Sequence, residues 1–229
     1  MSDGTGTPVR VADAARIMLR PLGNPLPLGF LALAGGTLLI SGLQLGWLQP
    51  SEGQDVALIL IAFVFPLQLL AATFGYLARD VVAGTGMGVL AGTWLSIGLV
   101  TLTRPAGTTS DALGLFLLLA AAAMVVPALA ASGAKLVPAA VLGTTALRFA
   151  TTGLYQLTDS GTWEDVTGIV GLALCALALY AALAMALEDA HRATVLPLGR
   201  RGAGSDALDA GLDAQLQHVE RAAGVREQL

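Results

Sequence analysis

Six dense apolar stretches separated by short polar loops constrain this chain more than any other feature of its sequence. Each stretch holds about 21–23 residues, which at about 1.5 Å per residue lets a helix cross the hydrocarbon core of a bilayer. Only 12% of the residues are charged, whereas a soluble domain carries about 25%. We therefore expect an all-α integral membrane protein with six transmembrane helices per protomer, over residues 27–48, 56–78, 81–103, 112–132, 136–157 and 166–187.

The composition argues against several other classes of protein. A net charge of −4 lacks the basic excess that nucleic-acid binding requires. The chain has one cysteine, Cys175, and two histidines, His191 and His218, so we expect no internal disulfide and no metal site. No nucleophile-and-base motif such as G-x-S-x-G or H-E-x-x-H occurs. We expect neither an enzyme nor a cofactor.

Basic residues gather on one side of the expected bundle, which predicts its orientation. The opposite side has a single basic residue, Arg104, among several carboxylates. Because positive residues stay in the cytoplasm, we expect a multi-pass protein of the plasma membrane with both termini cytoplasmic. The basic residues on the cytoplasmic side are Arg10, Arg16, Arg20, Arg79, Lys135, Arg192, Arg200, Arg201, Arg221 and Arg226.

The sequence divides into three parts. Residues 21–199 form the expected six-helix domain, with a pore through the bundle. Residues 1–20 are a cytoplasmic segment, either a short interfacial helix or a mobile lead-in. Residues 200–229 form a cytoplasmic tail that is either loosely ordered or a helix binding a partner or the membrane. The helical alternative rests on four apolar residues that share one face at helical spacing, namely Leu208, Leu212, Leu216 and Val219.

The clearest local motif lies where the first helix enters the membrane. Asn24 suits a helix N-cap and Pro25 suits the first helical position. A second proline, Pro27, stiffens this start further. The positive end of the helix dipole would favour an anion, bound by the N–H groups of Leu28, Gly29 and Phe30. The same residues also suit a well-made helix start with no ligand.

Three polar residues inside the apolar stretches are candidates for a pore. Arg148 lies near the middle of the fifth stretch, where an arginine costs about 2.5–3.5 kcal/mol even on a lenient insertion scale. No carboxylate lies at the same depth, so Arg148 lines a pore, binds substrate, has a structural role such as a contact between protomers, or snorkels. Gln68 follows Pro66, which can kink the helix, and either faces a pore or packs. Thr85 offers a further polar step.

The start of the first helix also resembles a known family. Asn24-Pro25-Leu26-Pro27-Leu28-Gly29-Phe30 is similar to the N-P-A-P-L-G-L signature of the acetate uptake transporters, of the succinate–acetate permease type. Thr194-Val195-Leu196-Pro197-Leu198-Gly199 resembles the T-V-L-P-I-G that follows their last helix. The resemblance covers residues 21–199 and includes Gly46-Trp47, Gln68, Trp94-Leu95-Ser96, Gly171 and Tyr180.

The resemblance implies a fold and a function. Members have six transmembrane helices, assemble as homo-hexamers in the lipid bilayer and hold a narrow pore in each protomer. They carry acetate, and some carry succinate or other small monocarboxylates, with protons. The helix-1 motif lies near the cytoplasmic mouth, and bulky apolar side chains form a central constriction.

The chain departs from the family pattern at the constriction. Leu33 and Leu90 stand where the family usually has phenylalanine and tyrosine, and Gly75 and Met185 stand at positions that are commonly acidic. These changes predict a wider constriction that admits a longer or more apolar carboxylate, and they leave proton coupling without its usual groups. The family position of Arg148 is usually apolar, so the resemblance assigns that residue no role.

We therefore interpret the chain as a membrane transporter or channel for acetate or related small monocarboxylates. In this hypothesis Leu33 and Leu90 form an apolar gate that favours a partly dehydrated or protonated acid. The alternatives are a pore of the same fold for a different small solute and a membrane scaffold that transports nothing. The candidate substrate-binding or pore residues are Asn24, Pro25, Pro27, Leu28, Gly29, Leu33, Gln68, Thr85, Leu90 and Arg148.

Overall fold

The computed structural model describes residues 22–191 and 193–201. Apart from one isolated backbone bridge between Lys135 and Arg200, these residues form helices and loops. The expected N-terminal segment, residues 1–20, and most of the expected tail lie outside the described residues. In chain order the elements are α2 (Leu26–Gln44), η1 (Pro50–Glu52), α3 (Gly53–Ile59), η2 (Leu60–Val64), α4 (Phe65–Leu77), α5 (Val81–Thr103), α6 (Asp111–Ser132), α7 (Leu136–Thr158) and α8 (Gly161–His191).

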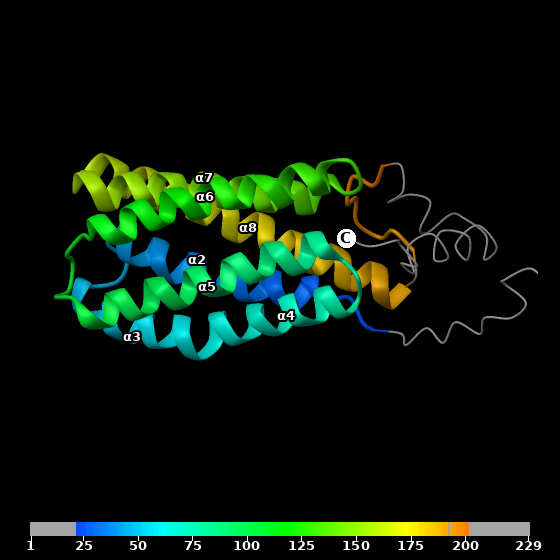
Figure 1. Ribbon diagram of the computed structural model, residues 1–229, viewed down its shortest axis with the longest axis horizontal. Coiled ribbons are helices and arrows are strands. Elements are labelled where there is room, and N and C mark those ends of the chain that lie inside the picture. Colours follow the sequence, from blue (N-terminus) through cyan, green and yellow to red (C-terminus); the bar gives the residue numbers. More distant parts are fainter. Residues whose placement is uncertain (1–21, 192, 202–229) are drawn as a thin grey trace, which may run out of the picture.

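The long helices lie side by side along the long axis of one elongated bundle (Figure 1). Short connections make successive helices antiparallel, and α2 packs on α8, α6 on α7, and α4 on α5. The helix ends therefore collect at two ends of the bundle. We call the end where α2 begins and α8 finishes the termini end, and the end where α2 finishes and α8 begins the distal end. Figure 1 has the termini end on the right.

Five helical segments of the described chain are long and apolar enough to cross a membrane. They are α2, α5, α6, α8 and a composite segment, Pro50–Leu77, that runs from η1 through α4. The all-helical membrane fold is thus confirmed. The sixth expected span coincides with α7, which is long enough at 23 residues but is less apolar than the other five. Arg148 and five threonines lower its hydropathy, so a membrane crossing by α7 stays a prediction.

Two span boundaries differ from those expected for identifiable reasons. The first helix finishes at Gln44 instead of residue 48, because Gly46 has a φ of 69° and turns the chain. That left-handed conformation suits glycine. The last helix is 31 residues long and extends beyond the expected 166–187 at both ends. An apolar stretch stops at charged residues such as Glu164 and Glu188, whereas a helix continues past them into water.

A π-helical turn, η2, interrupts the second span just before Pro66. Proline has no backbone N–H to donate, and its ring clashes with the carbonyl group four residues earlier. A wider π turn relieves that clash, and the extra residue rotates the following helix relative to the preceding one. In this arrangement Gln68 of α4 is completely buried. The expected irregularity at Pro66 thus precedes a buried polar side chain.

Candidate functional site

Two cavities penetrate the bundle from its opposite ends. The distal cavity has a volume of about 160 Å³ and is lined by α2, α3, α5, α6, α7, α8 and the loop between α5 and α6. The termini cavity has a volume of about 130 Å³ and is lined by α2, α5, α6, α7 and the adjoining loop residues Asp80 and Lys135. These cavities define the candidate site.

One layer of buried apolar side chains lies between the two cavities. Leu33 of α2, Leu90 of α5 and Met124 of α6 are all 0% exposed. Along each of these helices, residues on the termini side line the termini cavity and residues on the distal side line the distal cavity. These flanking residues are Phe30 and Ile40 on α2, Met87 and Trp94 on α5, and Ala131 and Leu117 on α6.

We call Leu33, Leu90 and Met124 the central layer. The sequence singled out Leu33 and Leu90 as a gate, and the structure places both between the cavities. It missed Met124, because α6 is apolar on every side and gives no signal for the face that points inward. Along their helices, the three residues of the central layer thus lie between the residues that line one cavity and those that line the other.

The start of α2 uses its backbone donors within the chain. The Asn24 Oδ1 atom accepts a hydrogen bond from the Leu26 N–H group at 3.1 Å. The helix begins at Leu26 with Pro25 at the N-cap position, so the prediction of Asn24 as the N-cap and Pro25 as the first helical residue was wrong by one position. The Gly29 N–H group donates to the Pro25 carbonyl oxygen at 3.2 Å. The prediction that this N–H group is free for an anion was therefore wrong. Phe30, the fifth helical residue, lies beyond the four whose N–H groups lack an intrahelical acceptor.

The helix-1 motif contributes different residues to the cavity from those expected. Neither cavity is lined by the five motif residues proposed for substrate, which are Asn24, Pro25, Pro27, Leu28 and Gly29. Instead Leu26 and Phe30 line the termini cavity. They are four residues apart and so lie on one helix face. Thr37, Ser41 and Gln44 continue this face at helical spacing, a signal that the prediction from sequence did not use.

Gln68 lies against the same part of α2. Its Nε2 atom donates to the Gly29 carbonyl oxygen at 3.3 Å. Its Oε1 atom is buried and has no hydrogen-bond partner among the described residues. The structure therefore brings Gln68 to the helix-1 motif, although Gln68 lines neither of the two cavities. An unpaired buried acceptor of this kind is costly.

Thr85 lies elsewhere. Its hydroxyl group is 3.0 Å from the Tyr76 hydroxyl group in an exposed contact between α4 and α5, and it lines neither of the two cavities. The expectation that Thr85 offers a polar step in a pore is corrected here. The face of α5 that lines the cavities carries Gly86, Met87 and Trp94 instead.

Gly75 of α4 lies in close contact with α5. A Cβ atom there would lie 2.8 Å from the Gly84 backbone nitrogen. Helices α4 and α5 therefore pack backbone against backbone at this point. A carboxylate at position 75 would not fit this arrangement.

Arg148 of α7 occupies the inner part of the distal cavity. Its side chain is 2% exposed and lines the cavity. The Nη2 atom donates to Gln44 Oε1 at 2.7 Å, and the Nη1 atom donates to Thr167 Oγ1 at 3.1 Å. Both partners are neutral. Among the described residues, no carboxylate is paired with Arg148.

The rest of the distal cavity is mainly apolar with a charged rim. Two cations and one carboxylate line it, namely Arg148, Arg104 and Glu164. Arg104 donates to the Thr109 carbonyl oxygen at 2.7 Å, and Glu164 accepts from the Tyr155 hydroxyl group at 3.1 Å. The apolar wall includes Ile97, Leu113, Leu117, Trp94 and Phe149.

The segment after α8 folds back across the termini end. Tyr180 donates its hydroxyl group to the Pro197 carbonyl oxygen at 2.8 Å. Leu198 is 1% exposed, and its carbonyl oxygen accepts from the Val137 N–H group at 3.1 Å. The segment with the T-V-L-P-L-G sequence thus ties α8 to the start of α7. We call residues 193–201 the strap.

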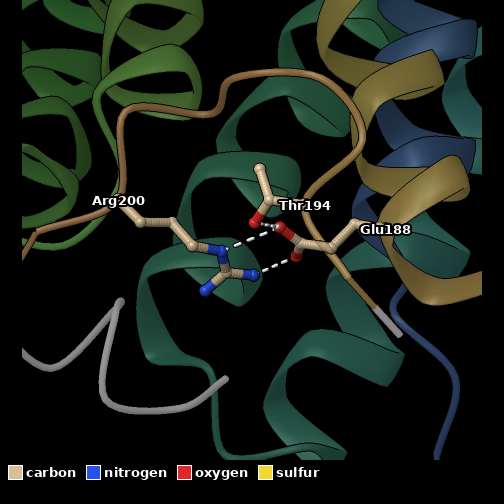
Figure 2. A network of polar contacts seen from close by, with 3 residues as sticks. All are labelled: Glu188, Thr194 and Arg200. Atoms are coloured by element: carbon tan, nitrogen blue, oxygen red, sulfur yellow. Dashed lines mark hydrogen bonds and ion pairs between the residues drawn. The ribbon is translucent and has the colours of Figure 1, made fainter. Parts of the chain in front are cut away.

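A polar network holds the strap in place (Figure 2). Arg200 binds the Glu188 carboxylate through two nitrogens, with its Nε atom 2.8 Å from Oε2. Thr194 donates to the same carboxylate at 3.5 Å. Lys135 lies nearby on the α6–α7 loop, where burial, and secondly the charge of Arg200, lower the pKa of its amino group. This cluster lies at the mouth of the termini cavity, since Lys135 lines it.

An apolar helical bundle with cavities at both ends and a closed layer between them defines a multi-pass helical membrane protein. The chain belongs to the GPR1/FUN34/yaaH family, whose model matches residues 7–199. The structure is also similar to that of the bacterial acetate channel SatP, with a TM-score of 0.70 and 22% sequence identity. That match covers 78% of this chain and 100% of SatP. No curated protein matches the chain. The resemblance to the acetate uptake transporters is thereby confirmed.

Proposed function

We propose that this protein is a membrane transporter or channel for acetate or related small monocarboxylates. The observation that carries the proposal is the pair of cavities at opposite ends of the bundle, with the buried central layer between them along α2, α5 and α6. Family membership and a fold shared with a bacterial acetate channel support it.

In the proposed path, a solute moves between the distal and termini cavities by displacing Leu33, Leu90 and Met124. Crossing an apolar layer strips water from a charged group, which is costly. The layer therefore favours a protonated or partly dehydrated acid over a hydrated ion. Gln68 lies beside Gly29 with an unpaired buried acceptor, and we propose that its Oε1 atom accepts a hydrogen bond from the acid hydroxyl group or from a water molecule near the layer.

We propose that the termini end faces the cytoplasm of a cell whose plasma membrane holds the protein. The support is the cluster of basic residues at that end, namely Arg79, Lys135, Arg200 and Arg201, against the positive-inside rule. We further propose a homo-hexamer with one path in each protomer. This follows the similarity to the acetate uptake transporters, and the large apolar side chains exposed on the helices could face either lipid or neighbouring protomers.

Uptake by proteoliposomes containing the purified full chain tests the function. We expect saturable entry of labelled acetate, propionate and butyrate that exceeds entry into protein-free liposomes. Acetamide, which is neutral and of similar size, should enter more slowly. Entry of acetamide at the same rate as acetate would favour a pore for a different solute. Absence of uptake for every solute, from protein shown to be folded and inserted, would favour a scaffold.

A further inference from the structure

The distal cavity contains a buried cation whose hydrogen-bonding capacity is only partly used. A guanidinium group has five N–H donors, and the described residues accept two of those of Arg148, through Gln44 and Thr167. Both acceptors are neutral, so the positive charge stays uncompensated. A buried charge without a counterion is strongly unfavourable, which makes an anion the natural ligand at this position.

The surroundings of Arg148 are organised to hold the guanidinium group. A Cβ atom at Gly171 of α8 would lie 2.7 Å from Arg148 Cζ and would also collide with Ser41 Oγ. Only glycine therefore leaves room for this side chain. Ser41 and Trp94 are nearly completely buried, and their Oγ and Nε1 atoms have no hydrogen-bond partner among the described residues. Trp94 lines the same cavity as Arg148.

We infer that the distal cavity is a binding site for a monocarboxylate with a short hydrocarbon tail, with Arg148 holding the carboxylate and Trp94, Leu117 and Phe149 packing on the tail. This inference rests on the proposed function and names its substrate class. Arginine forms charge-assisted, often bidentate, hydrogen bonds with carboxylates. The apolar wall offers no polar partner to the rest of the ligand.

Size and charge narrow the ligand further. The cavity volume of about 160 Å³ is similar to the roughly 150 Å³ of an apolar cavity that holds benzene. The cavity therefore has room for a tail longer than the methyl group of acetate. Glu164 and Arg104 carry opposite charges on the rim of the same cavity, so the rim supplies no net positive charge for a second carboxylate. A butyrate-like monocarboxylate thus fits better than acetate, which has little tail, or succinate, which has two charges.

Ligand binding measured at equilibrium tests the site without requiring transport. The chain has three tryptophans, and replacing Trp47 and Trp163 by phenylalanine leaves Trp94 as a fluorescent reporter in the cavity wall. In detergent or nanodiscs, we expect saturable quenching by butyrate, with at least tenfold weaker binding of butyramide and of succinate. Equal affinities for butyrate and its neutral amide would overturn the inference, and this comparison needs no variant of Arg148.

The Arg148→Gln variant should weaken butyrate binding at least tenfold and leave butyramide binding unchanged. Arg148→Lys should give an intermediate affinity for butyrate. Arg201→Gln removes an arginine from the opposite end of the bundle and serves as the matched control, with butyrate affinity unchanged. Unchanged butyrate affinity in a folded Arg148→Gln protein would overturn the inference. Chloride that displaces butyrate at equal concentration would also overturn it, because the site would then be a general anion site.

The binding and uptake experiments can refute the proposed site and the proposed transport separately. Butyrate binding that depends on Arg148 in a protein without uptake would refute the proposed transport and retain the site. Uptake by a protein whose butyrate binding does not depend on Arg148 would retain transport and refute the site.

Discussion

Gly171 of α8 lies directly against the guanidinium group of Arg148 of α7. A Cβ atom at Gly171 would lie 2.7 Å from Arg148 Cζ and 2.8 Å from Nη1. The guanidinium group also links three helices, because its acceptors are Gln44 on α2 and Thr167 on α8. A missing side chain on one helix thus creates the space for a charged side chain on its neighbour.

The first prediction follows from this contact. Gly171→Ala must displace the guanidinium group, and overpacking of this kind costs about 1–3 kcal/mol. We expect a lower free energy of unfolding, together with weaker butyrate binding. Gly143→Ala on α7 is the matched control because nothing lies within 4 Å of a Cβ atom there. The control should be neutral or more stable by up to about 1 kcal/mol, since alanine favours helix. Equal stability of the two variants in thermal unfolding would contradict the contact.

The second prediction concerns Gln68. Replacement of Gln68 by leucine removes its hydrogen bond to Gly29 and also removes the unpaired Oε1 atom. Because these effects oppose each other, we expect stability to change by no more than about 1 kcal/mol. Labelled acetate uptake should nevertheless fall several-fold, because the polar group near the central layer is lost.

Thr85→Ala provides the comparison for Gln68→Leu. Thr85 contacts Tyr76 and lines neither cavity, so acetate uptake should stay at the wild-type rate. A larger loss of uptake in Thr85→Ala than in Gln68→Leu would place the path on the opposite face of α5.

The third prediction concerns the strap. Glu188 and Arg200 form a largely buried pair, with side-chain exposures of 9% and 13%. Glu188→Gln leaves the arginine without its counterion, and hydrogen bonds to charged groups contribute about 1.5–3 kcal/mol. We expect a loss of stability of that size. The double variant Glu188→Gln/Arg200→Gln should lose less than the two single variants together. Strict additivity in chemical unfolding would show that the pair does not hold the strap.

The sequence predicted the helices well because the bilayer imposes a simple rule. A stretch long and apolar enough to span it becomes a helix, so α5 and α6 begin and end close to the expected residues, and the less apolar α7 does so as well. Arg148 could also be singled out, since an arginine at that depth is costly anywhere. Its partners could not be, because Gln44 and Thr167 come from other helices and carry no spacing signal.

The sequence could not predict which side of each helix points into the bundle. In a soluble helix, polar residues mark the outer face, whereas α6 is apolar on all sides and Thr37 and Ser41 of α2 are buried. Leu26, Phe30 and Met124 were missed, and Thr85, which was assigned to a pore, lines neither of the two cavities. The prediction of a free N–H group at Gly29 was wrong for a different reason. This N–H group donates a hydrogen bond to the Pro25 carbonyl oxygen.

The most direct test of the proposed path compares acetate uptake by wild-type protein, Leu90→Ala and Leu119→Ala in proteoliposomes. Leu90 is 0% exposed in the central layer, whereas Leu119 of α6 is 68% exposed on the outer surface. Truncating Leu90 costs about 2–5 kcal/mol of stability but opens the layer, so uptake should rise several-fold in protein shown to be folded. Leu119→Ala should match the wild type. Equal uptake by all three proteins would contradict a path through the central layer.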